Sequence, residues 1–161
     1  APRIYWCVLA GVLFGLSHFV HTRLHPRIIE VGLHEDGSLR DRHLWHLPPL
    51  APHVFAIRMD AELDFAAASS FEKYITEQLR EQAQIQHVCL FAQPINRIDA
   101  TGVETLQQLR QYLNRSGIQL HISGIKLPVE KALKLAGELG PDSQVSLYRN
   151  DTEAIQALRS L

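Results

Sequence analysis

The sequence predicts an α/β fold in which a mixed or largely parallel β-sheet is flanked by about four helices and preceded by an apolar N-terminal helix. Two observations predict it. Residues 4–20 are almost entirely apolar, and strand-like and helix-like segments alternate from residue 54 onward. The residues beyond the apolar run suffice for one domain with its own core and are too few for two.

The apolar run from Ile4 to Val20 is interrupted only by Ser17 and His18. As a helix rising about 1.5 Å per residue, it falls slightly short of the roughly 30 Å hydrocarbon core of a bilayer. A buried core helix and a secretory signal are the alternatives. A core helix usually keeps a polar face, and no small-residue cleavage pattern follows this run. We therefore expect residues 4–20 to be a membrane span.

Basic residues indicate how this span is oriented. Arg23, Arg27, Arg40 and Arg42 follow the apolar run, whereas only Arg3 precedes it. Because positively charged flanks tend to stay in the cytoplasm, residues after about 21 are expected on the cytoplasmic side of an inner or plasma membrane. The chain starts at Ala1 without an initiator Met, so we expect it to be the C-terminal part of a longer protein.

Turn-forming residues organise the segment after the span. Ile28–Val31 is a short β-branched run, the dipeptide at residues 36–37 is Asp-Gly, and Ser38–Trp45 is predicted to return as a second strand. Leu47–Pro52 contains three prolines and cannot be a central strand or a helix. The sequence therefore predicts a hairpin followed by a stiff connector.

The first strand and helix of the predicted core follow the connector. Val54–Met59 is apolar and strand-like, and Phe71, Ile75 and Leu79 then recur every four residues, as on the buried face of a helix. Ser69 and Glu72 have the spacing of a capping box, which predicts that this helix starts beside them.

The remaining core elements follow the same alternation. Apolar and period-two segments predict strands at 87–92, 118–122 and 145–148. A helix is expected after each strand. The first has Val103, Leu106, Leu109 and Leu113 on its buried face, the second runs from Pro128 to Leu139 and is closed by Gly140 and Pro141, and the terminal one passes through Ala154, Ile155, Leu158 and Leu161.

Composition excludes some classes of function. The 17 acidic and 16 basic residues nearly cancel, so no long-range field attracts nucleic acid and no nucleic-acid partner is expected. The only cysteines, Cys7 and Cys89, lie in the apolar run and in a predicted strand, where they form no disulfide framework. This cysteine usage is compatible with a reducing cytoplasm.

Two clusters of titratable residues are candidates for metal or catalytic sites. His18, His21 and His25 have helical spacing, but no carboxylate or thiolate lies near them in sequence to complete a metal site. Asp60 and Asp64, with Glu62 between them, could form an acidic site, although a solvated loop is the expected setting. The sequence contains no phosphate-binding Gly-rich loop, nucleophile elbow or His-Glu-x-x-His pattern. We therefore predict no catalytic residue, metal or cofactor, and no enzyme activity.

The loop after the 87–92 strand is the strongest candidate for a functional site, because sites in open α/β sheets lie at the carboxyl ends of strands. It ends in Asp99, Ala100, Thr101 and Gly102, and Thr101 forms a capping-box pattern with Glu104. A glycine here lets a ligand or a partner backbone approach the helix start, which can accept an anion or a phosphorylated side chain. Alternatively, Asp99 and Thr101 only cap the helix.

At these residues the sequence resembles a known family. The order of elements, together with the segment Ile-Asp-Ala-Thr-Gly at 98–102, resembles a STAS domain, the module named after sulfate transporters and anti-sigma factor antagonists. The apolar run followed by His-Pro-Arg-Ile-Ile-Glu-Val-Gly at 25–32 is similar to the last span and the start of the C-terminal STAS domain of SulP-type anion permeases. The resemblance divides the chain into the end of a span (1–24), the hairpin and Pro-rich connector (25–52) and the STAS core (53–161).

The resemblance also implies how the loop works. In anti-sigma factor antagonists the loop reads Asp-Ser-Ser/Thr-Gly, and its first hydroxyl residue accepts a phosphate from a partner kinase. The matching positions here are Asp99, Ala100, Thr101 and Gly102. Ala100 has no hydroxyl, so the usual acceptor is absent, and Thr101 is the only substitute. Our hypothesis is that the loop is a docking surface rather than a phosphoswitch.

The function that this resemblance implies is regulatory. The domain would act through protein contacts on a sulfate-like anion transporter, with the transmembrane core of the same transporter, a cytosolic regulatory protein or a second protomer as partner. Two alternatives stay open. One is a free-standing signalling module that binds an anti-sigma factor or kinase, and the other is a nucleotide-binding module that uses the helix start at Thr101.

Overall fold

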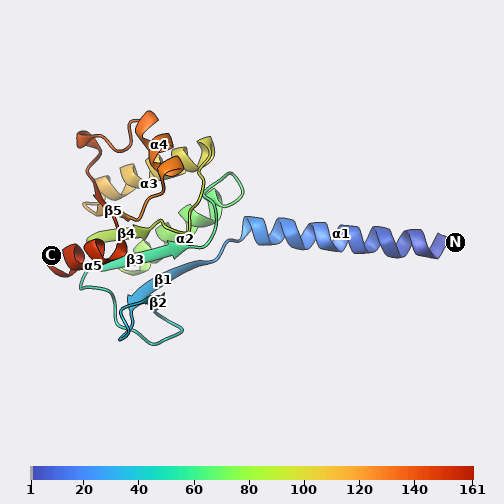
Figure 1. The fold of residues 1–161 in the computed structure, drawn as a ribbon, viewed down its shortest axis with the longest axis horizontal. Helices are drawn as coiled ribbons and strands as arrows, with labels where there is room; N and C mark the ends of the chain where they lie inside the picture. The colour runs from blue at the N-terminus through green and yellow to red at the C-terminus, as the bar shows by residue number, and fades with distance from the viewer. Residues whose placement is uncertain (1) are drawn as a thin grey trace.

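The computed structural model describes residues 2–161 and shows one long helix leaving an α/β domain (Figure 1). Helix α1 (Pro2–Leu24) has no buried residue and is apolar enough to cross a membrane by length and composition. At about 1.5 Å per residue its 23 residues extend about 35 Å, which exceeds the hydrocarbon core of a bilayer. The helix is thus longer at both ends than the apolar run alone predicts.

The domain contains a mixed sheet, as the sequence predicts. Its strand order over the described residues is β2-β1-β3-β4-β5-β6. Strands β3 to β6 are parallel to their neighbours, and β1 is antiparallel to both β2 and β3. The strands are β1 (Ile28–Leu33), β2 (Leu39–Asp41), β3 (Val54–Met59), β4 (His87–Phe91), β5 (Gln119–Ser123) and β6 (Val145–Tyr148).

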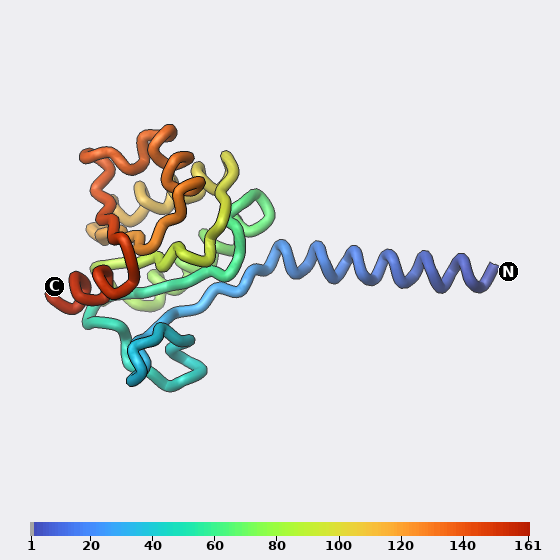
Figure 2. Tube along the Cα trace, in the orientation of Figure 1, coloured from blue at the N-terminus to red at the C-terminus, as the bar shows by residue number. Residues whose placement is uncertain are grey.

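Helices cover both faces of the sheet (Figures 1 and 2). They are α2 (Ala68–Glu81), α3 (Ala100–Arg115), α4 (Leu127–Leu135), the short 3₁₀ helix η1 (Pro141–Ser143) and α5 (Asp151–Arg159). One core cluster packs α2, α3 and α4 against the sheet through Phe71, Leu106 and Leu133. The second cluster packs α5 and the connector against the opposite face. The four helices around the sheet and the separate α1 confirm the predicted fold class.

Strand β4 contributes side chains to both core clusters. Successive side chains of a strand point to opposite faces. Val88 and Leu90 lie in the first cluster, whereas Cys89 and Phe91 lie in the second, and all four are at most 2% exposed. A strand that is buried on both faces reads as a continuous apolar run, as expected for a central parallel strand.

The predicted hairpin is present, but its second strand is shorter than expected. Gly37 has φ +86° in the connecting turn, and β2 ends at Asp41. The Asp41 carboxylate then accepts hydrogen bonds from the backbone N–H groups of His43 and Leu44, 3.1 and 3.3 Å long. These bonds fold residues 42–46 into turns, so the strand predicted to reach Trp45 stops four residues earlier.

Two predicted helix boundaries are wrong. Ser69 and Glu72 form no capping box, because α2 begins at Ala68 and the Asp64 carboxylate accepts hydrogen bonds from the N–H groups just before it. Helix α4 ends at Leu135 rather than Leu139. Gly137 adopts φ +74°, and the N–H of Glu138 bonds back to the carbonyl of Leu133, which closes the helix early.

Candidate functional site

Asp99 starts helix α3. Its backbone is extended, its Oδ1 accepts a 2.8 Å hydrogen bond from the N–H of Gly102, and its carbonyl accepts one from Val103. Asp99 is therefore the N-cap, which satisfies a backbone donor that the helix leaves unpaired. The capping box predicted for Thr101 and Glu104 is wrong, because Thr101 lies within the first turn rather than ahead of it.

The second carboxylate oxygen of Asp99 accepts a hydrogen bond from another loop. Its Oδ2 accepts a 2.9 Å hydrogen bond from the N–H of Phe65. Backbone bonds join the same two segments, from Leu63 N–H to the Arg97 carbonyl and from Asp99 N–H to the Leu63 carbonyl. The β3–α2 loop (residues 60–67) and the β4–α3 loop (residues 92–99) are consequently one connected unit at the carboxyl ends of neighbouring parallel strands.

Gly102 is required by this connection. A β-carbon at Gly102 would collide with the carbonyl oxygen of Leu63 and with the Ile98 side chain. The backbone that approaches Gly102 thus belongs to the chain itself, and not to the ligand or partner that the sequence suggests. Since the Gly102 N–H already donates to Asp99, this donor is not available to a bound anion.

Ala100 and Thr101 lie on the outside of the same turn. Both residues are exposed, while Gly102 is buried. The carbonyl of Thr101 accepts a hydrogen bond from the Thr105 hydroxyl, as in an ordinary helix interior. The four predicted residues therefore separate into two roles: Asp99 and Gly102 hold the loops together, and Ala100 and Thr101 present a surface.

Two of the three acidic residues after β3, Asp60 and Asp64, form ion pairs. Asp60 lies 3.1 Å from Arg58 Nε and 3.6 Å from an Arg27 nitrogen, and Asp64 pairs with Arg23. Within residues 2–161 no three His, Cys, Asp or Glu side chains are grouped so that they could hold a metal ion. Asp64 instead connects the domain to the last turn of α1, and Asp60 connects it to the segment that follows α1.

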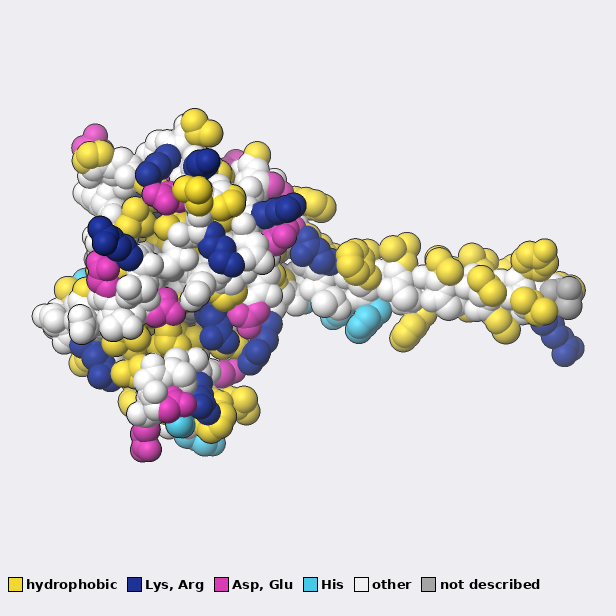
Figure 3. All heavy atoms as spheres, viewed as in Figure 1, with side chains coloured by type: hydrophobic (Ala, Val, Ile, Leu, Met, Phe, Trp, Pro, Cys, Tyr) yellow, Lys and Arg dark blue, Asp and Glu magenta, His cyan; other side chains and the backbone are white. Residues whose placement is uncertain are grey.

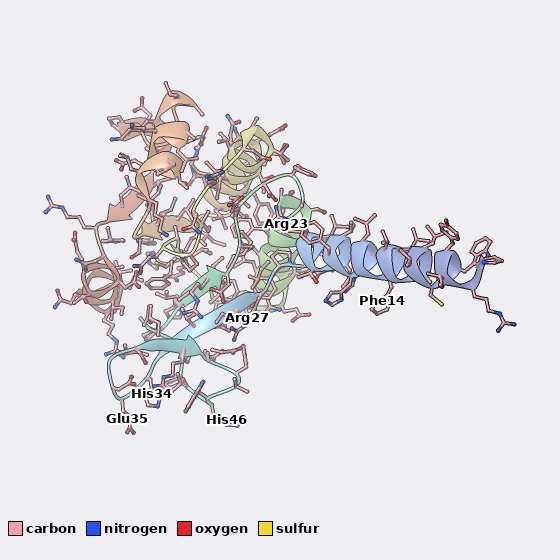
Figure 4. The ribbon with its side chains drawn as sticks, turned by 45° about the vertical axis from the view of Figure 1, so that its right-hand side comes forward. Phe14, Arg23, Arg27, His34, Glu35 and His46 are labelled. Carbon is pink, nitrogen blue, oxygen red and sulfur yellow. The ribbon has the colours of Figure 1, made fainter. Side chains whose placement is uncertain are left out.

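The end of α1 and the segment that follows it are joined to the domain at three points. Arg23 pairs with Asp64, the Ser70 hydroxyl donates a 2.5 Å hydrogen bond to the Leu24 carbonyl, and the Asp60 N–H bonds to the carbonyl of Arg27. Figure 4 shows Arg23 and Arg27 at the junction of α1 and the sheet. The β3–α2 loop thus links the end of α1 to Asp99 and helix α3.

A polar chain that the sequence analysis missed lies on the sheet. His87 Nδ1 is 3.0 Å from His121 Nε2, and His121 Nδ1 is 2.9 Å from the Tyr148 hydroxyl. Burial and the neighbouring His87 lower the pKa of His121 to about 4. Burial, followed by His53, also lowers the pKa of His87. The sequence shows that His87 and His121 lie in two predicted strands. It does not show that they meet, because the register between the two strands depends on residues far apart in the sequence.

Comparison with known proteins identifies the domain. Residues 49–142, more than half of the chain, match the family described as the STAS domain. This chain belongs to the STAS domain family. The family resemblance drawn from the loop motif and the order of elements is therefore confirmed.

Curated relatives of this STAS domain are transporters. "Probable sulfate transporter Rv1739c" of Mycobacterium tuberculosis is 25% identical over 158 residues, which cover 97% of this chain and 28% of that protein. "Probable sulfate transporter 4.2" of Arabidopsis thaliana is 30% identical over 146 residues, which cover 81% of this chain and 21% of that protein. The chain thus spans about a quarter of the length of these relatives.

Solved structures share the fold. The murine Solute Carrier 26 family member A9 anion transporter, in an inward-facing state, superposes with a TM-score of 0.78 at 15% identity, over 97% of this chain and 26% of that one. The Bacillus anti-sigma factor antagonist SpoIIAA superposes with a TM-score of 0.53 at 17% identity, over 69% of this chain and 94% of that one. The STAS core is common to both, and the transporter match extends over nearly all of the chain.

Proposed function

We propose that this chain is the cytoplasmic regulatory domain of a SulP-type anion transporter, preceded by the end of the last membrane span. The observation that carries this proposal is the direct junction of α1 with the STAS domain, fixed by the Arg23–Asp64 pair and the Ser70–Leu24 hydrogen bond. The similarity to transporters over 97% of the chain, α1 included, supports it. Residues 1–24, 25–52 and 53–161 are then the span, the hairpin with its connector and the regulatory core.

The proposed regulation works by contact rather than by catalysis. Ala100 and Thr101 form the exposed part of the loop and dock on the transmembrane core of the same transporter, on a second protomer or on a cytosolic regulator. Asp99 and Gly102 hold the backbone of this surface, Asp99 through its hydrogen bond from the Gly102 N–H and Gly102 through its close packing on Leu63. Anion selection resides in membrane spans outside these residues.

Charge insertion in the full-length transporter tests the docking surface. Ala100→Arg and Thr101→Arg add a large cation to the exposed first turn of α3, and we expect both to lower sulfate uptake or assembly in a host that lacks its own uptake system. Gln111→Arg is the matched control, because Gln111 is exposed on the same helix about three turns further on. Unchanged uptake and assembly in both loop variants would show that the loop is structural only.

Phosphorylation is tested separately. The docking hypothesis predicts that protein isolated from cells carries no stoichiometric phosphate at Thr101, which intact-mass and peptide mass spectrometry will measure. Thr101→Ala provides the comparison spectrum. A stoichiometric phosphate that disappears in this variant would show that the loop is a phosphoswitch, and would contradict the docking hypothesis.

The nucleotide-binding and free-standing alternatives have their own tests. Nucleotide binding at the α3 start is disfavoured because Asp99 occupies the Gly102 N–H, and isothermal calorimetry with ATP and GTP checks it. The free-standing signalling module is disfavoured by Ala100 and by α1. Sequencing the gene upstream of the Ala1 codon distinguishes the transporter from the signalling module. Further apolar spans there support the transporter, and a start codon immediately before Ala1 supports the signalling module.

A further inference from the structure

Phe65 is an exposed aromatic residue in a loop whose backbone is held by hydrogen bonds. Its side chain is 74% exposed. The backbone is fixed on both sides, because the Phe65 N–H donates to Asp99 and the Asp64 carboxylate accepts hydrogen bonds from Ala66 and Ala67. The loop therefore presents a large apolar side chain on the outside of the domain.

The β3–α2 loop that carries Phe65 lies beside the last turn of α1. Asp64, the residue before Phe65, pairs with Arg23, and Ser70 bonds to the Leu24 carbonyl. Figure 1 shows this loop on the side of the domain from which α1 leaves, and Figure 3 shows hydrophobic atoms protruding there beside the helix. Phe19 and Leu24 of α1 are 61% and 43% exposed, so both α1 and the domain carry exposed apolar side chains at this junction.

We propose that Phe65 inserts into the cytoplasmic surface of the lipid bilayer, at the level where α1 leaves it. This inference rests on the proposed function, because α1 must span the membrane to bring the loop to the lipid. Aromatic side chains favour this boundary between hydrocarbon and headgroups. The Arg27 side chain, 60% exposed at the same junction, is placed to meet anionic headgroup phosphates.

A single aromatic residue suits a lipid surface better than a protein surface. The core of a protein interface gathers several apolar residues into one patch. On the domain side of this junction, Phe65 is the one large hydrophobic residue with high exposure in the loops described, since Leu63 is buried and Ile95 is 2% exposed. Beside a spanning helix the bilayer is already present, so one inserted side chain adds a direct contact between the domain and the lipid.

Three chains with one tryptophan each test the insertion. The 161-residue sequence has only Trp6, in α1, and Trp45, which is 48% exposed and contacts His34 at an edge-on angle in the hairpin region. Figure 4 places His34 and His46 away from the junction, so Trp45 is the matched control for an exposed aromatic on the domain. The third chain combines Phe65→Trp with Trp6→Phe and Trp45→Phe.

Each chain is reconstituted in vesicles of phosphatidylcholine and phosphatidylglycerol in which part of the phosphatidylcholine carries bromines near the headgroup end of its acyl chains. We expect the Phe65→Trp chain to be quenched and shifted to shorter emission wavelength, and the chain that keeps only Trp45 to show neither effect. The chain that keeps only Trp6 reports on α1 itself.

The outcomes separate the two proposals. Quenching of Trp6 without quenching in the Phe65→Trp chain would overturn the lipid contact, leave the membrane span intact and point to a protein partner at Phe65. Absence of quenching in both chains would overturn the membrane span, and the lipid contact with it. Equal quenching in the Trp45 chain would show non-specific adsorption of the domain and would also overturn the proposed contact.

Discussion

The carbonyl oxygen of Leu63 occupies the space in which a β-carbon of Gly102 would lie. Leu63 precedes α2 and Gly102 is in the first turn of α3, so the contact joins the starts of two helices from different strands. Only a residue without a side chain permits so close an approach. The surface that Ala100 and Thr101 present is therefore held by backbone packing behind it.

Replacing Gly102 by Ala should destabilise the domain. The added methyl group forces either the Leu63 backbone or α3 to move, and overpacking of this kind costs about 1–3 kcal/mol. Gly140→Ala is the matched control, because a β-carbon there meets nothing closer than 3.9 Å. Urea unfolding in detergent, followed by circular dichroism, measures the free energy of unfolding of both variants. Equal stabilities of the two variants would contradict the close contact.

Replacing Asp99 by Ala should loosen both loops at once. The variant leaves the N–H groups of Gly102 and Phe65 without their acceptor, and loss of an N-cap alone costs about 1 kcal/mol. We expect faster hydrogen exchange at both amides, with Asp99→Asn intermediate because it keeps one acceptor oxygen. Thr101→Ala should change neither amide. Exchange that rises at Gly102 but not at Phe65 would mean that Asp99 acts only as a cap.

Local pattern predicted the buried faces of the elements. Phe71 and Ile75 are fully buried in α2, and Leu120 and Ile122 are at most 3% exposed in β5, as their spacings indicate. Burial of one face decides such periodicity, so it can be read within a few residues.

The caps could not be predicted in the same way. The spacing of Ser69 and Glu72 satisfies the capping-box pattern, yet Asp64 satisfies the backbone donors at that helix start. Sequence predicted where the candidate loop lies and that it comprises residues 99–102, but not that Asp99 accepts a hydrogen bond from Phe65. That bond joins residues 34 positions apart, and the packing of two loops decides it.

The buried ion pair between Arg110 and Glu138 should contribute more than an exposed one. Arg110 Nε lies 2.7 Å from a Glu138 oxygen, and the two side chains are 16% and 7% exposed. Arg110→Ala leaves a buried carboxylate without its partner, which costs on the order of 3 kcal/mol. Lys134→Ala breaks a comparable 2.8 Å pair with Glu130, but Lys134 is 62% exposed, so the expected loss is below about 1 kcal/mol. Similar losses in urea unfolding would contradict the difference in burial.

The His87–His121–Tyr148 chain predicts that the domain loses stability in mild acid. A neutral His121 can accept one hydrogen bond and donate the other, whereas a charged one needs acceptors on both sides. Its folded pKa of about 4 lies below the ordinary value of 6.5, so the unfolded chain binds the proton more tightly. The stabilisation is complete above about pH 6.5 and is lost as the pH falls toward 4.

The size of this effect follows from the shift in pKa, which corresponds to roughly 3 kcal/mol. His87 adds to it with the same sign, because its pKa is lowered too. Urea unfolding at pH 7.5 and 4.5 measures the loss, and His121→Gln should reduce it, since an amide offers both a donor and an acceptor without titrating. An imidazole of His121 that titrates near 6.5 by NMR, or an equal loss in the Gln variant, would show that this buried chain does not set the acid sensitivity of the fold.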